Sequence, residues 1–136
     1  MHDRYVLDAG IIALYFAGNR RVKRYLDEIL DGKAFGYICE INIAEFSYHY
    51  AREFGLDAAR TKARLIRGRP IRVEGVDEGL TSIAAEFKLR HNDYSLADCY
   101  LLALAQKYDA TLLTTDGPLS KNGKVRATLI PPPKKG

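Results

Sequence analysis

Residues 5–14 of the chain read YVLDAGIIAL, and the fold can be predicted outward from this stretch. The apolar run at residues 5–7 ends in Asp8, and apolar residues resume at helical spacing from Ile11. This pattern predicts a strand, a turn and a helix, with an acid at the turn. In a sheet of parallel strands, residues directly after a strand lie at the edge where ligands bind. Asp8 is therefore the first candidate functional residue.

The rest of the chain alternates between helical and strand-like segments. An amphipathic stripe predicts a helix over residues 19–31 that begins at Asn19. Asn42 and Glu45 have the form of a capping box, which predicts the start of a helix that Gly55 ends. Further strands are predicted at residues 35–39, 71–73, 111–115 and 128–130, and further helices at residues 56–67, 80–87 and 95–108.

Strands that alternate with helices in this order favour an α/β fold with a parallel sheet. We expect one domain over residues 1–130, with a central sheet of about four to five strands and helices on both faces. Residues 131–136 are rich in proline and lysine, and we expect them to form a disordered tail.

Composition limits the class of protein. Of the 136 residues, 47% are hydrophobic and 28% charged, as in globular domains, and no apolar stretch approaches the roughly 20 residues of a membrane-spanning helix. The first ten residues do not resemble a secretory signal, so we expect a soluble, cytoplasmic protein. Cys39 and Cys99 are too few for a zinc-ligand pattern or a disulfide framework, and we interpret them as buried, reduced thiols.

The formal net charge is +4, and the positive charge is clustered. Seven of the 21 basic residues lie in one stretch, namely Arg52, Arg60, Lys62, Arg64, Arg67, Arg69 and Arg72. Such a cluster suits a polyanionic partner, but a solvated helix face has the same composition. Both interpretations stay open at this point.

Four acids occupy equivalent places in the predicted fold. Asp8, Glu45 and Asp116 each follow a strand or lie in the first turn of the next helix, and Asp98 begins the helix that leads into the strand at residues 111–115. Each acid alone has an ordinary explanation as a helix or turn cap. Four carboxylates at one sheet edge repel one another unless they are protonated or bound to cations. Divalent ions that prefer oxygen ligands are their natural partners.

The segments YVLDAGIIAL, INIAEF, YSLADCYLLALA and TLLTTDGPL, in this order and at these separations, resemble the PIN-domain family, and most closely its VapC-type toxins. The similarity runs over residues 5–119. It implies a PIN-like nuclease domain in which Asp8, Glu45, Asp98 and Asp116 bind Mg²⁺ or Mn²⁺ and carry out endonucleolytic hydrolysis of RNA. It also implies a homodimer and an antitoxin protein as a partner.

Two positions depart from the family pattern. Members usually carry Ser or Thr two residues after the first Asp, whereas this chain has Gly10, so a water or Thr114 would take the role of that hydroxyl. Many members carry a further acid after the fourth motif, but residues 117–119 provide none, which leaves the number of metal ions open. His49 and Asp93 are weaker candidates for contact with a metal or its water.

The aromatic residues Phe46, Tyr48 and Tyr50 are expected in the core and at a dimer surface, with a stacking platform for bases as the alternative.

An acidic pocket at a sheet edge also occurs in proteins with functions other than that of a toxin nuclease. A response-regulator receiver domain is excluded because the first strand lacks paired acids and no strand ends in Lys-Pro. An RNA-processing nuclease that is not a toxin, and a catalytically weak PIN fold that binds RNA or a partner, stay open.

Overall fold

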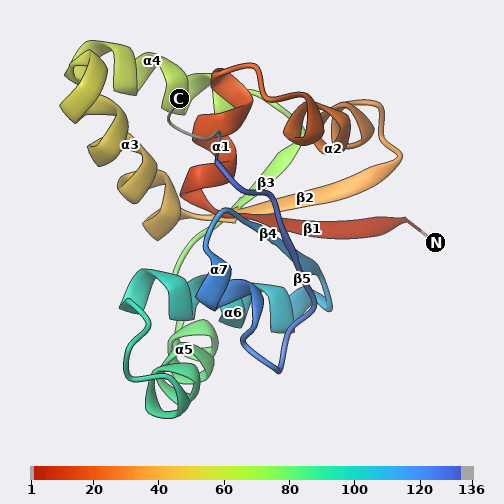
Figure 1. Ribbon diagram of the computed structural model, residues 1–136, viewed down its shortest axis with the longest axis vertical. Coiled ribbons are helices and arrows are strands. Elements are labelled where there is room, and N and C mark those ends of the chain that lie inside the picture. The colour runs from red at the N-terminus through yellow and green to blue at the C-terminus, as the bar shows by residue number, and fades with distance from the viewer. Residues whose placement is uncertain (1, 133–136) are drawn as a thin grey trace.

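The computed structural model describes residues 2–132 and has an α/β architecture (Figure 1). Its strands are β1 (Asp3–Leu7), β2 (Ala34–Cys39), β3 (Ile71–Glu74), β4 (Thr111–Thr114) and β5 (Ala127–Leu129). Its helices are α1 (Ala9–Phe16), α2 (Arg20–Leu30), α3 (Glu40–Phe54), α4 (Leu56–Arg67), α5 (Glu78–Arg90), α6 (Leu96–Tyr108) and α7 (Gly117–Ser120). The strands form one sheet in the order β3-β2-β1-β4-β5, and every pairing is parallel. The predicted fold class is confirmed.

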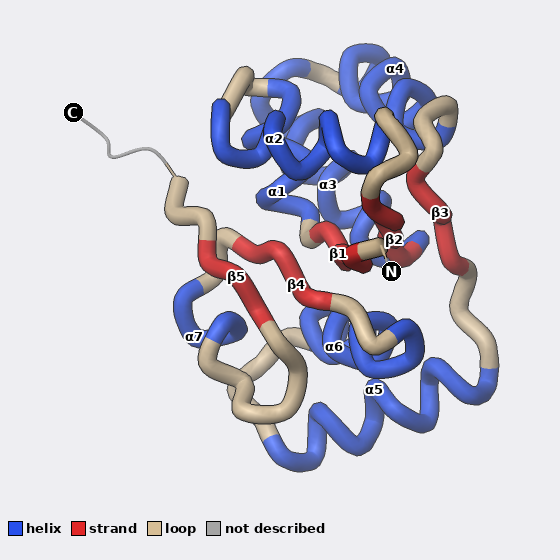
Figure 2. Tube along the Cα trace, turned by 90° about the vertical axis from the view of Figure 1, so that its right-hand side faces the viewer, coloured by secondary structure: helices blue, strands red, loops and turns tan. Residues whose placement is uncertain are grey.

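Helices cover both faces of the sheet. In Figure 2, α1 to α4 lie on one side of the strands and α5 to α7 on the other. Neighbouring strand residues point to opposite faces, so Leu7 packs into the core under α1 to α4 while Val6 packs into the core against α5 and α6. Leu112 and Leu113 of β4 divide between the two cores in the same way. Because β4 and most of β2 are buried on both faces, these two strands are largely apolar runs rather than alternating patterns.

The strand order places a ligand-binding edge at the centre of the sheet. From β1 the chain moves outward to β2 and β3, and it then crosses to β4 on the other side of β1. The carboxyl ends of β1 and β4 therefore border the point at which the strand order reverses. Asp8 directly follows β1, and the segment that contains Asp116 follows β4, so the topology brings these two acids to this point.

One predicted helix start is wrong. Helix α3 begins at Glu40 directly after β2, with Cys39 at the N-cap and no side-chain cap bond. Asn42, the predicted cap, is fully buried inside the helix, and neither its amide nitrogen nor its amide oxygen has a hydrogen-bond partner. The chain enters the helix without a connecting loop, so Glu45 lies in the second turn instead of the first.

The other predicted features differ little from the structure. Asn19 caps α2 by accepting hydrogen bonds from the amides of Arg21 and Val22. Cys39 and Cys99 are buried free thiols, as expected. Of the predicted tail, residues 131 and 132 have no regular structure and residues 133–136 lie outside the described part of the chain. Within residues 2–132, no helix has both the length and the apolar character that a bilayer span requires.

Candidate functional site

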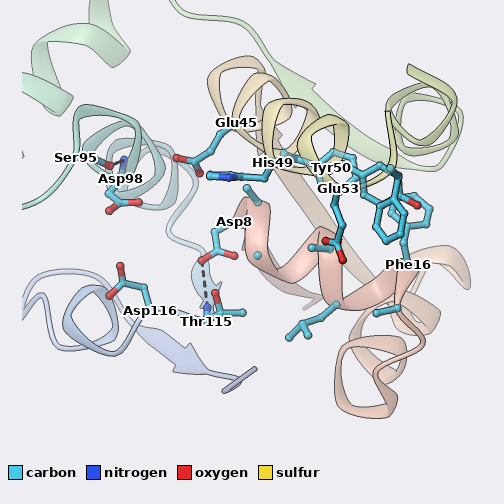
Figure 3. Close-up of a pocket in the computed structure, with 17 residues that line it drawn as sticks. Asp8, Phe16, Glu45, His49, Tyr50, Glu53, Ser95, Asp98, Thr115 and Asp116 are labelled. Carbon is cyan, nitrogen blue, oxygen red and sulfur yellow. Dashed lines mark hydrogen bonds between the residues drawn. The ribbon is translucent and has the colours of Figure 1, made fainter. Parts of the chain in front are cut away.

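A pocket of about 610 Å³ opens at the carboxyl edge of the sheet. The four predicted acids Asp8, Glu45, Asp98 and Asp116 all line it, and Figure 3 shows their carboxyl groups facing the same space. They come from the ends of β1 and β4, from the second turn of α3 and from the first turn of α6. Residues separated by up to 108 positions in the chain therefore converge in one cavity.

Asp8 is fixed by three hydrogen bonds. One carboxylate oxygen, Oδ1, accepts from the amide of Ile11 at 2.8 Å and caps α1. The other, Oδ2, accepts from the Thr114 hydroxyl at 2.5 Å and from the Thr115 amide at 3.2 Å. Asp8 is only 6% exposed, so its carboxyl group lies at the bottom of the pocket in a set orientation.

Thr114 joins the first acid to the last. Its hydroxyl donates to Asp8 and accepts from the Asp116 amide at 3.0 Å. The sequence-based hypothesis that a water or Thr114 supports Asp8 is thus confirmed for Thr114. Asp116 uses Oδ1 to accept from the Leu119 amide at 3.1 Å, which caps α7, and this leaves Oδ2 free of the cap.

Asp98 lies at the third position of α6. Its amide donates to the hydroxyl of Ser95, the N-cap residue, at 3.1 Å, so the predicted Ser95 cap is confirmed. The donor of this bond is the backbone amide of Asp98, and the carboxylate oxygens of Asp98 take no part in it. The carboxylate itself faces the pocket beside Glu45 (Figure 3).

Helix α3 contributes a row of polar side chains to the pocket wall. Glu45, His49 and Glu53 recur every four residues and lie on one face of the helix. His49 is beside the Glu45 carboxyl group in Figure 3. The sequence interpretation did not single out Glu53, although the four-residue spacing from Glu45 is a signal that could have found it. Asp93, the weaker candidate, is exposed and is not part of the pocket wall.

The carboxyl groups of the pocket disfavour ionisation in one another. Burial raises the pKa of Asp8, and hydrogen bonds from Thr114 and two backbone amides oppose that rise. Burial also raises the pKa of Glu45 and that of Asp98, and the charges of neighbouring pocket acids raise both further. One buried acid and two half-buried acids with raised pKa values form a site whose charge a bound cation would neutralise.

The donor set suits a hard divalent cation. Every acid of the pocket supplies oxygen, which Mg²⁺ and Mn²⁺ prefer, and the pocket leaves room for water. Within residues 2–132, no three His, Cys, Asp or Glu side chains are placed so that together they could hold a metal ion. Mg²⁺ in proteins usually retains several waters and takes only one or two carboxylates, so an open arrangement of carboxylates fits this ion.

The far end of the pocket is apolar and aromatic. Phe16, Phe46, Tyr50 and Phe54 line it, and successive ring centroids lie 5.8, 5.3 and 4.6 Å apart. Phe46 is buried in the core, as predicted, whereas 58% of Tyr48 is exposed.

The basic cluster is partly absorbed by local contacts. Arg67 forms two hydrogen bonds to Glu40 at 2.8 and 2.6 Å, and Arg72 pairs with Glu74 at 2.9 Å. Lys62 lies over the ring of Phe16 at 4.8 Å, and Arg69 donates to the Tyr15 hydroxyl. Arg60 and Arg64 of α4 are exposed and have no ion pair within residues 2–132.

Comparison with solved structures finds the same fold in several toxin–antitoxin proteins. A chain of VapBC2 from Rickettsia felis bound to promoter DNA aligns with a TM-score of 0.75 at 16% identity, covering 93% of this chain and 98% of that chain. VapC20 of Mycobacterium tuberculosis, described as a toxin that cleaves the sarcin-ricin loop, aligns with a TM-score of 0.69 at 26% identity and covers 89% and 95%. A chain of DNA-bound VapBC from Salmonella typhimurium gives a TM-score of 0.75 at 10% identity, covering 94% and 98%. A search of curated protein sequences gives no match.

The family comparison agrees with this likeness. The family model described as the PIN domain matches residues 5–125, a span that includes all four pocket acids and runs from within β1 to the loop before β5. The chain belongs to the PIN-domain family.

Proposed function

We propose that this protein is a metal-dependent endoribonuclease and the toxin of a toxin–antitoxin pair. The observation that carries the proposal is the convergence of Asp8, Glu45, Asp98 and Asp116 on one pocket at the reversal point of a parallel sheet. The raised pKa values of Asp8, Glu45 and Asp98, and the carboxylate oxygens that all four acids offer, favour a divalent cation, Mg²⁺ or Mn²⁺, as the cofactor. Membership of the PIN-domain family supports a nuclease over other uses of an acidic pocket.

Each acid has its own role in this proposal. Asp8, Asp98 and Asp116 bind the cation directly or through water, and Glu45 is either a ligand or the group that orients the attacking water. When bound, the cation supplies an acidified water and neutralises charge on the phosphate oxygens. Thr114 holds the Asp8 carboxylate in a fixed orientation from below the pocket, which preserves the geometry when the cation dissociates.

The substrate proposed is single-stranded or loop RNA. Hydrolysis by water leaves 5′-phosphate and 3′-hydroxyl ends, because no ribose oxygen attacks the phosphate. The acids line a pocket of about 610 Å³ at the carboxyl edge of the sheet, and the exposed Arg60 and Arg64 suit contacts with the phosphate backbone. VapC20, which shares the fold at 26% identity, is described as cleaving an RNA loop, and this also supports the proposal.

Two protein partners are proposed. The solved VapBC and FitAB structures are toxin–antitoxin complexes, some with DNA, which supports an antitoxin as a partner of this chain. The apolar half of the pocket and the exposed aromatic residues of α3 offer contact surface for such a partner or for a second copy. A cytoplasmic location follows from the proposal, since the RNA substrates of a toxin are there.

The enzymatic part is tested with purified protein and a labelled RNA containing a single-stranded loop. Cleavage is expected with millimolar Mg²⁺ or Mn²⁺ and is expected to stop in excess EDTA. Asp8→Asn is expected to abolish cleavage with the fold intact, because asparagine still accepts a hydrogen bond at Oδ1. Asp31→Asn, a matched change at an exposed acid, is expected to retain full activity. Cleavage that continues in EDTA would refute the metal-dependent mechanism, and binding of RNA without cleavage would favour the weak, RNA-binding alternative.

The homodimer is tested separately from catalysis. Light scattering over a range of protein concentrations is expected to give twice the 15.3 kDa mass of the chain. Tyr48→Ser is expected to shift the protein toward monomer, because 58% of this tyrosine is exposed on α3. A monomer mass that does not change with concentration would refute the dimer.

A further inference from the structure

Gly10 lies in the first turn of α1, where a side chain would have no room. A Cβ atom at this position would lie 2.3 Å from the Thr115 hydroxyl oxygen and 3.1 Å from the Thr115 methyl carbon. Gly10 does not have a positive φ, so the backbone conformation does not require glycine here. Glycine is also among the poorest helix formers. Because position 10 has no side chain, the side chain of Thr115 can occupy the space next to α1.

Thr115 faces the pocket, in contrast to its neighbour in the chain. Thr114 is fully buried and its hydroxyl is used in bonds to Asp8 and to the Asp116 amide. Thr115 is half-buried and lines the pocket next to Asp8 (Figure 3). Its amide donates to Asp8 Oδ2, which fixes the Thr115 backbone to the first acid of the site.

The Thr115 hydroxyl has no hydrogen bond among residues 2–132, although its oxygen lies close to the place that a Cβ atom of Gly10 would occupy on α1. A hydroxyl group can donate one hydrogen bond and accept others. Carboxylate oxygens in the pocket only accept when they are ionised, whereas a hydroxyl can donate to a water without adding charge. The position of Thr115 therefore suits a contact with water held by the acids.

We propose that Thr115 is a positioning residue of the metal site. Its hydroxyl forms a hydrogen bond to the water shell of the cation that Asp8 and Asp116 hold, and Gly10 is glycine because this hydroxyl takes the space of its side chain. The inference rests on the proposed metal site, and it adds to the four acids a fifth group that is not an acid, at the position of the fourth motif directly before Asp116. Outer-shell groups of this kind typically change metal affinity by about 10 to 100-fold.

The test measures Mn²⁺ affinity by calorimetry, without RNA. Thr115→Val removes the hydroxyl at nearly constant volume and is expected to weaken Mn²⁺ binding by about 10-fold. Thr115→Ser keeps the hydroxyl and is expected to bind within about twofold of wild type. Thr128→Val is the matched control, because Thr128 is also half-buried but lines a separate pocket at the other end of the sheet, and it is expected to bind as wild type.

An exchange of the two positions tests the spatial part of the inference. Gly10→Ser alone is expected to weaken Mn²⁺ binding, because its side chain collides with Thr115. Gly10→Ser combined with Thr115→Ala removes the collision and supplies a hydroxyl from α1 instead. The double variant is expected to bind Mn²⁺ more tightly than either Gly10→Ser or Thr115→Ala alone.

The outcomes separate this inference from the proposed function. Wild-type affinity in Thr115→Val, with normal Mn²⁺ binding by wild type, would overturn the role of Thr115 and leave the metal site intact. A double variant no better than the single variants would overturn the exchange of positions. Failure of the wild-type protein to bind Mn²⁺ would overturn the proposed metal site and this inference with it. Melting curves of each variant establish that the protein compared is folded.

Discussion

The role of Asp98 can be decided by the sign of a stability change. If Asp98 only stabilises the start of α6, Asp98→Asn weakens its interaction with the helix dipole and costs about 0.3 to 1 kcal/mol. The bond from its amide to Ser95 survives in the variant, because it uses the backbone. For a domain of this size, 1 kcal/mol corresponds to roughly 3 to 5 °C in melting temperature. A purely structural Asp98 therefore predicts a variant that melts about 1 to 5 °C lower.

The metal-site interpretation predicts the opposite result in EDTA. Asp8, Glu45 and Asp116 face Asp98, and the charges of Asp116 and Asp8 help to raise its pKa. Removing one negative charge relieves this repulsion, so Asp98→Asn should melt at the wild-type temperature or above it. Mg²⁺ at a hundred times its Kd should stabilise the wild type by about 2.7 kcal/mol, or roughly 8 to 13 °C, and the variant by much less.

Four melting temperatures settle the question: wild type and Asp98→Asn, each in EDTA and in millimolar Mg²⁺. Asp31→Asn, an exposed acid outside the pocket, is the control for removing a charge from the surface. A variant that melts lower than wild type in EDTA and responds equally to Mg²⁺ would make Asp98 a structural residue. That result would also remove the residue that lies between Glu45 and Asp116 in the proposed site.

Three further predictions follow from the same structure. The pKa of Asp98 in the folded protein is raised from 3.8, so the stability that its protonated form contributes is complete below about pH 4 and is lost as the pH rises through the folded-state pKa. In EDTA, the melting temperature of Asp98→Asn relative to wild type should therefore increase between about pH 4 and pH 7. A difference in melting temperature that does not change with pH would contradict the raised pKa. Asn42→Leu should raise the free energy of unfolding by about 1 to 3 kcal/mol in urea titrations, because the buried amide has no hydrogen-bond partner, and a loss of stability would indicate a partner such as a buried water. Changing Arg60 and Arg64 to Ala should reduce the slope of log RNA affinity against log salt by about one unit or less for each lost contact, whereas an unchanged slope would place both residues away from RNA.

The sequence predicted the acids of the pocket because their positions depend on local structure. Asp8 and Asp116 each follow an apolar run, and a residue after a parallel strand lies at the binding edge whatever the rest of the fold does. Asp98 was predicted at the start of a helix, and it lies in the first turn of α6, three residues after the capping Ser95, because a polar cap followed three residues later by an acid marks such a start. The same rule failed at Asn42, where burial in the core overrides the local preference of the side chain for a cap.

What the sequence did not predict depends on contacts between distant segments. A side chain at position 10 would collide with Thr115 because β1 and β4, the strands that precede these two residues, are neighbours in the sheet. No pattern within either segment of the sequence indicates this close approach. The basic cluster is similar: it reads as one patch, but Arg67 is paired with Glu40 of another helix. Residue type and spacing predict the element and the position in the fold that a residue occupies. Tertiary packing decides which of its polar groups are already bonded to other residues and which are available for a ligand.

The sequence interpretation treated each acid as either a helix cap or a metal ligand, but in the structure one carboxylate can serve as a cap and still face the pocket. Asp8 caps α1 through Oδ1, and Asp116 caps α7 through Oδ1, yet both carboxyl groups face the pocket. A cap bond holds one oxygen of the carboxylate and thereby fixes the direction of the other, which is the condition that a metal ligand must meet. At Asp8 the second oxygen is held as well, by Thr114 and Thr115, so Asp8 is the most rigid acid of the site. In the proposed metal site, the capping bonds of Asp8 and Asp116 are therefore also the bonds that orient these two carboxylates toward the cation.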